Sequence, residues 1–249
     1  MLRASWPLPR RFATAKARSV YRQRGAPIAV GAPFFYGGKM LDETLIETLP
    51  PLWRLALAYA PKATKGQWLT LMALDMRLAG VVRSAREPIL AQMRLAWWRD
   101  RLNDKAANWP KGEPLLAAMH CWNDQHGALI GLVDGWEALL GEAPLAAESL
   151  LALADGRAVA CAALSPHAEV SRMARGWALA DLAAHVSDAQ EQLLLADQLA
   201  AHDWRASRLP RAMRPLVVLH GIASRHRGDA SKLQGVSVFT LIRLGLLGV

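Results

Sequence analysis

Two neighbouring stretches decide the fold: Leu71-Met-Ala-Leu-Asp-Met-Arg-Leu-Ala-Gly-Val-Val-Arg-Ser84 and, after a short turn, Arg86-Glu-Pro-Ile-Leu-Ala-Gln-Met-Arg-Leu-Ala-Trp-Trp-Arg-Asp100. In the first, apolar residues recur at the spacings of three and four that mark one face of an α-helix: Leu71, Leu74, Leu78 and Val81. The second begins at Pro88, and proline is tolerated in the first turn of a helix. The spacing predicts helices over 67–83 and 87–106, the second with an apolar face of Ile89, Met93, Ala96 and Trp97.

The helical period continues through the rest of the chain. Further helices are predicted over 41–49, 52–59, 114–123, 128–140, 144–164, 169–198, 210–226 and 236–247, with loops at 60–66 and 225–235. No stretch alternates apolar and polar residues for long, as a half-buried strand does. The apolar share of 53% comes largely from Ala and Leu, which favour helices. We therefore expect an all-α protein, with one helical domain over 40–249 behind a distinct tail over 1–39.

Positive charge is concentrated in the tail. Residues 1–41 hold eight Lys and Arg residues and no acidic residue, so removing these eight charges from the net +9 leaves +1 for the rest. The domain therefore lacks the basic surface that nucleic-acid binding requires. The tail is interpreted as a targeting peptide, as a basic arm for anionic lipid or a partner, or as sequence upstream of the true start. We favour a start at Met40, because an acidic first helical turn follows it.

The cysteines, the histidines and the lengths of the uncharged stretches argue against a disulfide framework, a metal site and a membrane span. Cys121 and Cys161 have no CxxC or Cys/His pattern around them, so we expect buried thiols rather than a disulfide framework. Four histidines stand singly on apolar helices and are expected to be satisfied core or surface residues: His120, His126, His185 and His220. No uncharged stretch reaches the roughly 20 residues of a membrane span. The expected location is the cytoplasm or the periphery of the inner membrane.

These motifs give the chain a resemblance to the squalene/phytoene synthase family over about residues 45–249. The resemblance rests on the stretch 71–104, with its Glu87-Pro88 turn and its Trp97-Trp98 pair, and on the proline-bounded segment 209–215. It implies a single helical bundle of the isoprenoid-synthase type. In active members, two aspartate-rich helices hold Mg²⁺ ions that clamp a prenyl diphosphate above an apolar well.

The first of these aspartate-rich motifs is degraded in this chain. When Arg77 is aligned with the arginine of the motif, Gly80 and Val81 occupy the positions of the paired acids and Ser84 that of the third acid. Asp75 is a poor substitute, because it lies about 200° around the helix from the expected face. Gly80 and Val81 offer no side-chain oxygen and Ser84 offers only a hydroxyl, so these positions cannot supply the carboxylates that hold the Mg²⁺ ions, and the resemblance implies a retained scaffold without this part of the chemistry.

The second motif is matched only in part. After Gly176-Trp-Ala178, the acids Asp181, Asp188 and Glu191 are the catalytic or metal-binding candidates if the protein is active. The arginine that the family carries in this motif has no counterpart here. We therefore assign no catalytic residue and predict no cofactor. Mg²⁺ is expected only if the protein is an active prenyl transferase.

Two further features have competing interpretations. Asp100 and Asp104 have the i, i+4 spacing of a metal site, but interleaved basic residues favour a solvated, ion-paired helix end. Trp97 and Trp98 point about 100° apart on a helix, so one can enter the core while the other, with Met93, contacts a pocket or partner.

Three functions follow as hypotheses. The first is a non-catalytic assembly or binding factor for a lipid, isoprenoid or protein partner. It is suggested by similarity to the family's non-catalytic branch, whose mitochondrial member assists assembly of respiratory complex I. The second is a divergent farnesyl or geranylgeranyl diphosphate transferase that uses Asp181, Asp188 and Glu191, with Asp75 or Asp104 in support. The third is a membrane-surface module that binds through the basic tail.

Overall fold

The computed structural model describes residues 38–85 and 87–226, and every regular element within these ranges is a helix. The all-α class is therefore confirmed. The α-helices are α2 (Gly38–Glu47), α3 (Pro51–Ala58), α4 (Lys62–Ser84), α5 (Pro88–Asn103), α6 (Pro114–Ala118), α7 (Ile130–Glu137), α8 (Ala147–Ala162), α9 (Glu169–Ala183), α10 (Ala189–Ala201) and α11 (Arg214–His226). Short 3₁₀ helices are η1 (Ala106–Asn108), η2 (Met119–Trp122), η3 (Gln125–Leu129) and η4 (Arg211–Met213).

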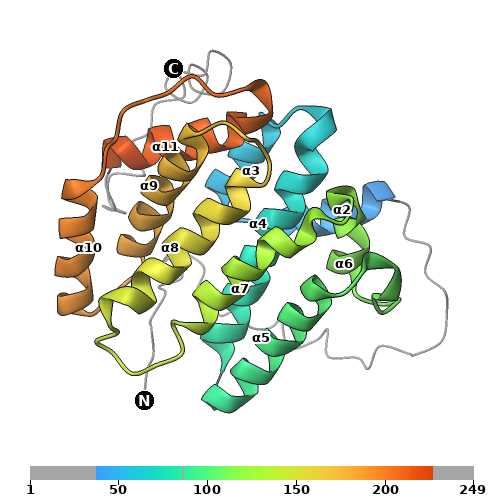
Figure 1. Ribbon diagram of the computed structural model, residues 1–249, viewed down its shortest axis with the longest axis horizontal. Helices are drawn as coiled ribbons and strands as arrows, with labels where there is room; N and C mark the ends of the chain where they lie inside the picture. Colours follow the sequence, from blue (N-terminus) through green and yellow to red (C-terminus); the bar gives the residue numbers. More distant parts are fainter. Residues whose placement is uncertain (1–37, 86, 227–249) are drawn as a thin grey trace, which may run out of the picture.

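The helices pack around one hydrophobic cluster that extends from Leu45 to Ala223. Helices α7, α8 and α9 lie side by side, α11 packs on α9 and α3, and α10 lies at the outer edge against α9 (Figure 1). Helix α4 packs against α7 and α5, and the end of α4 and the start of α5 form the lower edge of the described molecule (Figure 1). No described helix is long and apolar enough to cross a membrane.

Helices α7 and α8 approach closely because glycines face each other between them. A Cβ atom on Gly135 would lie 2.6 Å from the Cα of Leu153, and one on Gly156 would overlap the backbone of Gly131. These contacts leave no room for larger side chains at the crossing. The close approach fixes α8 at the centre of the bundle, where its one buried charged residue can reach several other helices.

Buried tryptophans join segments that are distant in the sequence. Trp68 on α4 donates its indole N–H to the carbonyl of Ala212, at 2.8 Å, and Trp122 donates to the Thr70 hydroxyl at 2.9 Å. Both rings are fully buried. A buried indole N–H requires a partner, so these bonds fix the positions of α4, η2 and η4 relative to one another.

Several sequence predictions need correction. Helix α4 starts at Lys62, so most of the loop predicted at 60–66 is helical. The single helix predicted over 169–198 is two helices, because the Asp188 side chain accepts hydrogen bonds from the backbone N–H groups of Gln190 and Glu191 and starts α10. Arg225, which falls in both the helix predicted over 210–226 and the loop predicted over 225–235, belongs to α11. Predictions for 1–37 and for the helix at 236–247 lie outside the described residues.

The largest correction concerns α5. The apolar face read from the sequence is not the face that packs on the core, because Ile89, Met93 and Trp97 are exposed, while Trp98 is the one of the two tryptophans that is buried. The core face consists instead of Ala91, Leu95, Trp98 and Leu102. Both sets repeat at helical spacing, so the period alone could not choose between them.

Candidate functional site

A pocket of about 570 Å³ opens between α2, α4, α5 and α6. Its lining includes the four residues that the sequence analysis aligned with the first acidic motif, and both tryptophans, namely Arg77, Gly80, Val81, Ser84, Trp97 and Trp98. Met93 is not part of the lining and stands on the exposed surface nearby. The structure thus brings together six of the predicted site residues in one cavity. Its volume lies within the ordinary range for small-molecule sites, about 300–1,000 Å³.

The charge of the pocket is positive. Arg77, Arg83 and Arg94 contribute to the lining, and Glu113 is the one acid among the described residues there. Arg77 pairs with Glu113 at 3.3 Å, which offsets one positive charge. Partial burial lowers the pKa of Arg83, although it stays far above neutral as an arginine. Leu45, Met76 and Leu115 supply apolar walls. An apolar cavity with guanidinium groups at its lining suits a ligand that combines a hydrocarbon part with an anionic group.

Asp75 and Asp181 meet away from this lining, at a buried arginine. Arg157 on α8 donates from Nε to Asp75 Oδ2 at 2.8 Å, and from Nη1 to Asp181 Oδ2 at 2.7 Å. Trp136 donates its indole N–H to Asp75 Oδ1 at 2.6 Å. Asp75 and Arg157 are each about 2% exposed. The guanidinium therefore occupies both carboxylate oxygens of Asp75 and one oxygen of Asp181, with which these acids could have ligated a metal.

Three tryptophan rings surround the same guanidinium. The Arg157 Cζ atom lies 5.6 Å from the ring centre of Trp53, 5.7 Å from that of Trp136 and 5.4 Å from that of Trp177. Burial alone would lower the pKa of Arg157, but Asp75 and Asp181 outweigh it and raise the pKa above its ordinary value. Burial raises the pKa of Asp75, and Arg157 and Trp136 limit the rise. The guanidinium thus stays charged and ties α4, α8 and α9 together.

The other two acids that the sequence analysis aligned with the second motif, Asp188 and Glu191, have separate structural contacts. Asp188 caps α10, accepting hydrogen bonds from the backbone of Gln190 at 2.8 Å and of Glu191 at 3.1 Å. Glu191 is buried and accepts a hydrogen bond from the backbone N–H of Leu145 at 2.7 Å. Neither lines the pocket. Within 38–85 and 87–226, no group of three or more His, Cys, Asp or Glu side chains is arranged to hold a metal ion.

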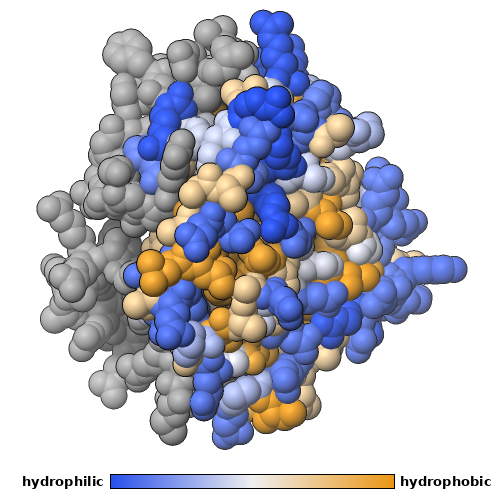
Figure 2. Space-filling model, turned by 60° about the vertical axis from the view of Figure 1, so that its left-hand side comes forward, coloured by the Kyte–Doolittle hydropathy of each residue, from blue (hydrophilic) through white to orange (hydrophobic). Residues whose placement is uncertain are grey.

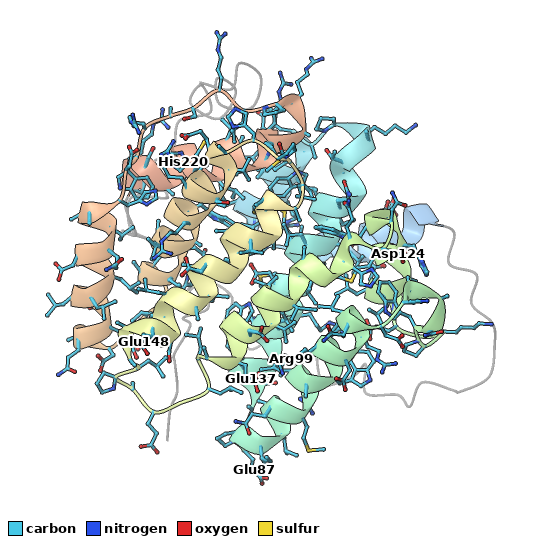
Figure 3. All side chains as sticks on the ribbon, viewed as in Figure 1. Glu87, Arg99, Asp124, Glu137, Glu148 and His220 are labelled. Atoms are coloured by element: carbon cyan, nitrogen blue, oxygen red, sulfur yellow. The ribbon has the colours of Figure 1, made fainter. Side chains whose placement is uncertain are left out.

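The Asp100–Asp104 pair lies at the end of α5, as the solvated interpretation expects. Asp100 is exposed, and Asp104 accepts hydrogen bonds from the Asn108 side chain at 2.7 Å and from the Lys105 backbone at 2.8 Å. Those two bonds lower the pKa of Asp104. One turn before the end of α5, Arg99 pairs with Asp134 and Glu137 on α7, and Figure 3 shows Arg99 beside Glu137.

Most of the single residues behave as predicted, with two exceptions. Cys121 and Cys161 are free thiols, but only Cys161 is buried, and Cys121 is partly exposed. His126 contacts the carbonyl oxygen of Asp104 at 2.9 Å, and His185 that of Asp181 at 2.6 Å. His220 is 2% exposed, and its Nε2 has no hydrogen-bond partner among the described residues. The expectation that this histidine is satisfied was therefore wrong for one ring nitrogen.

Sequence reasoning missed Arg157, the residue that organises the buried acids. One signal was present, since Arg157 follows Leu150 and Ala154 and precedes Cys161 at helical spacing, on a face otherwise built from apolar residues. A charged residue at such a position indicates a buried ion pair. Its partners Asp75 and Asp181 are 82 and 24 residues away, so only the tertiary structure identifies them.

Comparison of the chain with protein-family models, with curated proteins and with solved structures found no match in any of the three.

Proposed function

We propose that this protein is a non-catalytic binding or assembly factor built on a scaffold of the squalene/phytoene synthase type. The observation that carries the proposal is the charge of the pocket. The positions aligned with the family's first acidic motif line a cavity whose described charges are three arginines and one glutamate. An arginine-lined cavity repels Mg²⁺ and attracts the anionic group of a lipid or isoprenoid directly.

The contacts of the four candidate acids support the same proposal. Asp75 and Asp181 are bound to Arg157, Asp188 caps a helix, and Glu191 holds the backbone at Leu145. Each acid contributes to the fold where it stands. The ligand class that we propose is therefore an anionic amphiphile held without metal. The partner suggested by the resemblance is the respiratory NADH dehydrogenase during its assembly.

The test is an incubation of the full chain with farnesyl or geranylgeranyl diphosphate and Mg²⁺, with diphosphate release as the readout. We expect release equal to that of a protein-free sample, while an active prenyl synthase assayed in parallel turns over. The Asp188→Asn variant is the matched control, because asparagine caps a helix about as well as aspartate and preserves the fold. Metal-dependent release by the wild type that Asp188→Asn abolishes would establish the transferase alternative instead.

A further inference from the structure

Exposed apolar side chains are concentrated at one end of α5. Of the six large apolar residues that are exposed in the described structure, four lie within nine residues: Ile89 at 58%, Leu90 at 48%, Met93 at 64% and Trp97 at 39%. At 100° per residue, all four fall within about a quarter to a third of the helix circumference. Monomeric proteins rarely leave such a contiguous apolar stripe without a partner.

The stripe lies on a convex end of the molecule. Helix α4 ends at Ser84 and α5 begins at Pro88, and this helical hairpin forms the lower edge of the view in Figure 1. Glu87, labelled in Figure 3, marks its lowest point. We call Arg83 and residues 87–94 the hairpin tip. Trp97 lines the pocket one turn beyond the tip, so the stripe leads from the tip to the cavity.

The charges at the tip favour an anionic partner. Arg83 at the end of α4 and Arg94 on α5 are both exposed, and Glu87 is the one described acid at the tip. Arg94 forms no ion pair with a described residue. Further along α5, Asp100, Arg101 and Asp104 give a mixed surface. The positive excess and the apolar side chains therefore coincide only in the first half of the helix.

We propose that the hairpin tip docks on an anionic lipid bilayer. Ile89, Leu90 and Met93 enter the boundary between headgroups and acyl chains, and Arg83 and Arg94 contact lipid phosphates. A fluid bilayer accepts a convex tip of flexible aliphatic side chains without a complementary cavity, whereas protein interfaces rely on aromatic anchors held in pockets. The proposal rests on the proposed function in one respect, namely that the bilayer is the source of the amphiphile that the pocket binds.

The experiment is sedimentation of the full chain with vesicles of phosphatidylcholine alone or enriched in phosphatidylglycerol. We expect binding to the anionic vesicles, and a loss of about tenfold or more in the double variant Ile89→Ser/Met93→Ser. The matched control is Leu193→Ser on α10, where an even more exposed leucine (68%) lies on another part of the surface. Figure 2 shows the molecule with the α10 side turned forward, where apolar areas alternate with hydrophilic ones. The control is expected to bind like the wild type.

A second readout reports insertion rather than contact. A nitrobenzoxadiazole label at Leu90→Cys, in a Cys121→Ser background, should shift its emission to the blue with anionic vesicles, and the same label at Leu193→Cys should not. Both labelled proteins keep the basic residues of 1–39, so a difference between them reports the tip alone.

Three outcomes would overturn the proposal. They are equal binding of the wild type and Ile89→Ser/Met93→Ser, an unchanged emission at position 90, and a wild-type dimer in solution that the double variant disperses. The last result would assign the stripe to contact between copies of the chain. No prenyl diphosphate is present in these assays, so their failure is distinguishable from the appearance of transferase activity.

Discussion

Replacing Arg157 with methionine should lower the free energy of unfolding by about 4 kcal/mol, because it leaves buried carboxylates without their counter-charge. Asp75 would lose its hydrogen bonds from Arg157 Nε at 2.8 Å and Nη2 at 3.3 Å and keep that from Trp136, and Asp181 would lose its bond at 2.7 Å. Methionine fills much of the same space, so the loss reports the charge rather than a large cavity. Urea denaturation of the two proteins, followed by far-ultraviolet circular dichroism, measures the difference.

A surface arginine provides the control for this prediction. Arg175 pairs with Asp155 across α9 and α8, but the two side chains are 32% and 52% exposed. Solvent screens such a pair, so Arg175→Met should cost less than about 1 kcal/mol. Equal stability losses in Arg157→Met and Arg175→Met would show that the buried cluster does not hold the bundle together.

Acidification should destabilise the fold through His220 by about 3 kcal/mol between pH 6.5 and pH 4. Burial, the nearby Arg172 and His202 lower the pKa of His220 to about 4, against an ordinary value of 6.5. The unfolded chain therefore binds the proton first as the pH falls. The stabilising contribution is complete above pH 6.5 and is lost through this window. The charge of Asp203 raises the pKa of His220, but this effect is smaller than the lowering caused by burial.

The packing around His220 explains why its ring is buried. Figure 3 places it on α11, and the irregular segment 203–210 passes beside it, with the Trp204 ring 5.5 Å from the imidazole. Arg172 on α9 holds this segment through the carbonyl oxygens of Asp203, at 2.5 Å, and Arg205, at 2.8 Å. Protonation of His220 would place a second positive charge near the guanidinium of Arg172.

Denaturation of the wild type and of His220→Gln at several pH values tests the assignment. The wild type should lose more stability on acidification, and the difference between the two proteins should develop between pH 6.5 and 4. His120→Gln, a change at an exposed position, is the control, because carboxylates titrate equally in both proteins. Its stability should depend on pH in the same way as that of the wild type. Parallel curves for the wild type and His220→Gln would assign the acid sensitivity to other groups.

The helical period in the sequence was sufficient for the class of fold and for most helices. It was insufficient where a polar side chain sets a helix boundary. Asp188 is the example, since its capping hydrogen bonds start α10 and so divide the predicted helix 169–198 into α9 and α10. It was also insufficient for α5, which has two apolar sets of residues, and only the packing of α5 against α7, α4 and η3 determines that the set with Leu95 and Leu102 is buried.

The candidate site was predictable in outline. Alignment of Arg77 placed Gly80, Val81 and Ser84 on one face of α4, and all of them line the pocket. The buried cluster was not predictable in the same way, because Asp75, Arg157 and Asp181 come from three helices and their pairing depends on the tertiary arrangement. Asp75 was expected to lie off the pocket face, and it does, but its partner was not foreseen.

The proposal that the pocket binds an anionic amphiphile without metal is tested most directly by calorimetric titration of the full chain with farnesyl phosphate, once with Mg²⁺ and once with a chelator. We predict the same affinity in both conditions, and a loss of about tenfold in Arg94→Gln, because one charge-assisted contact to the phosphate disappears. Binding that requires Mg²⁺ and that Arg94→Gln leaves unchanged would contradict metal-free recognition by arginine.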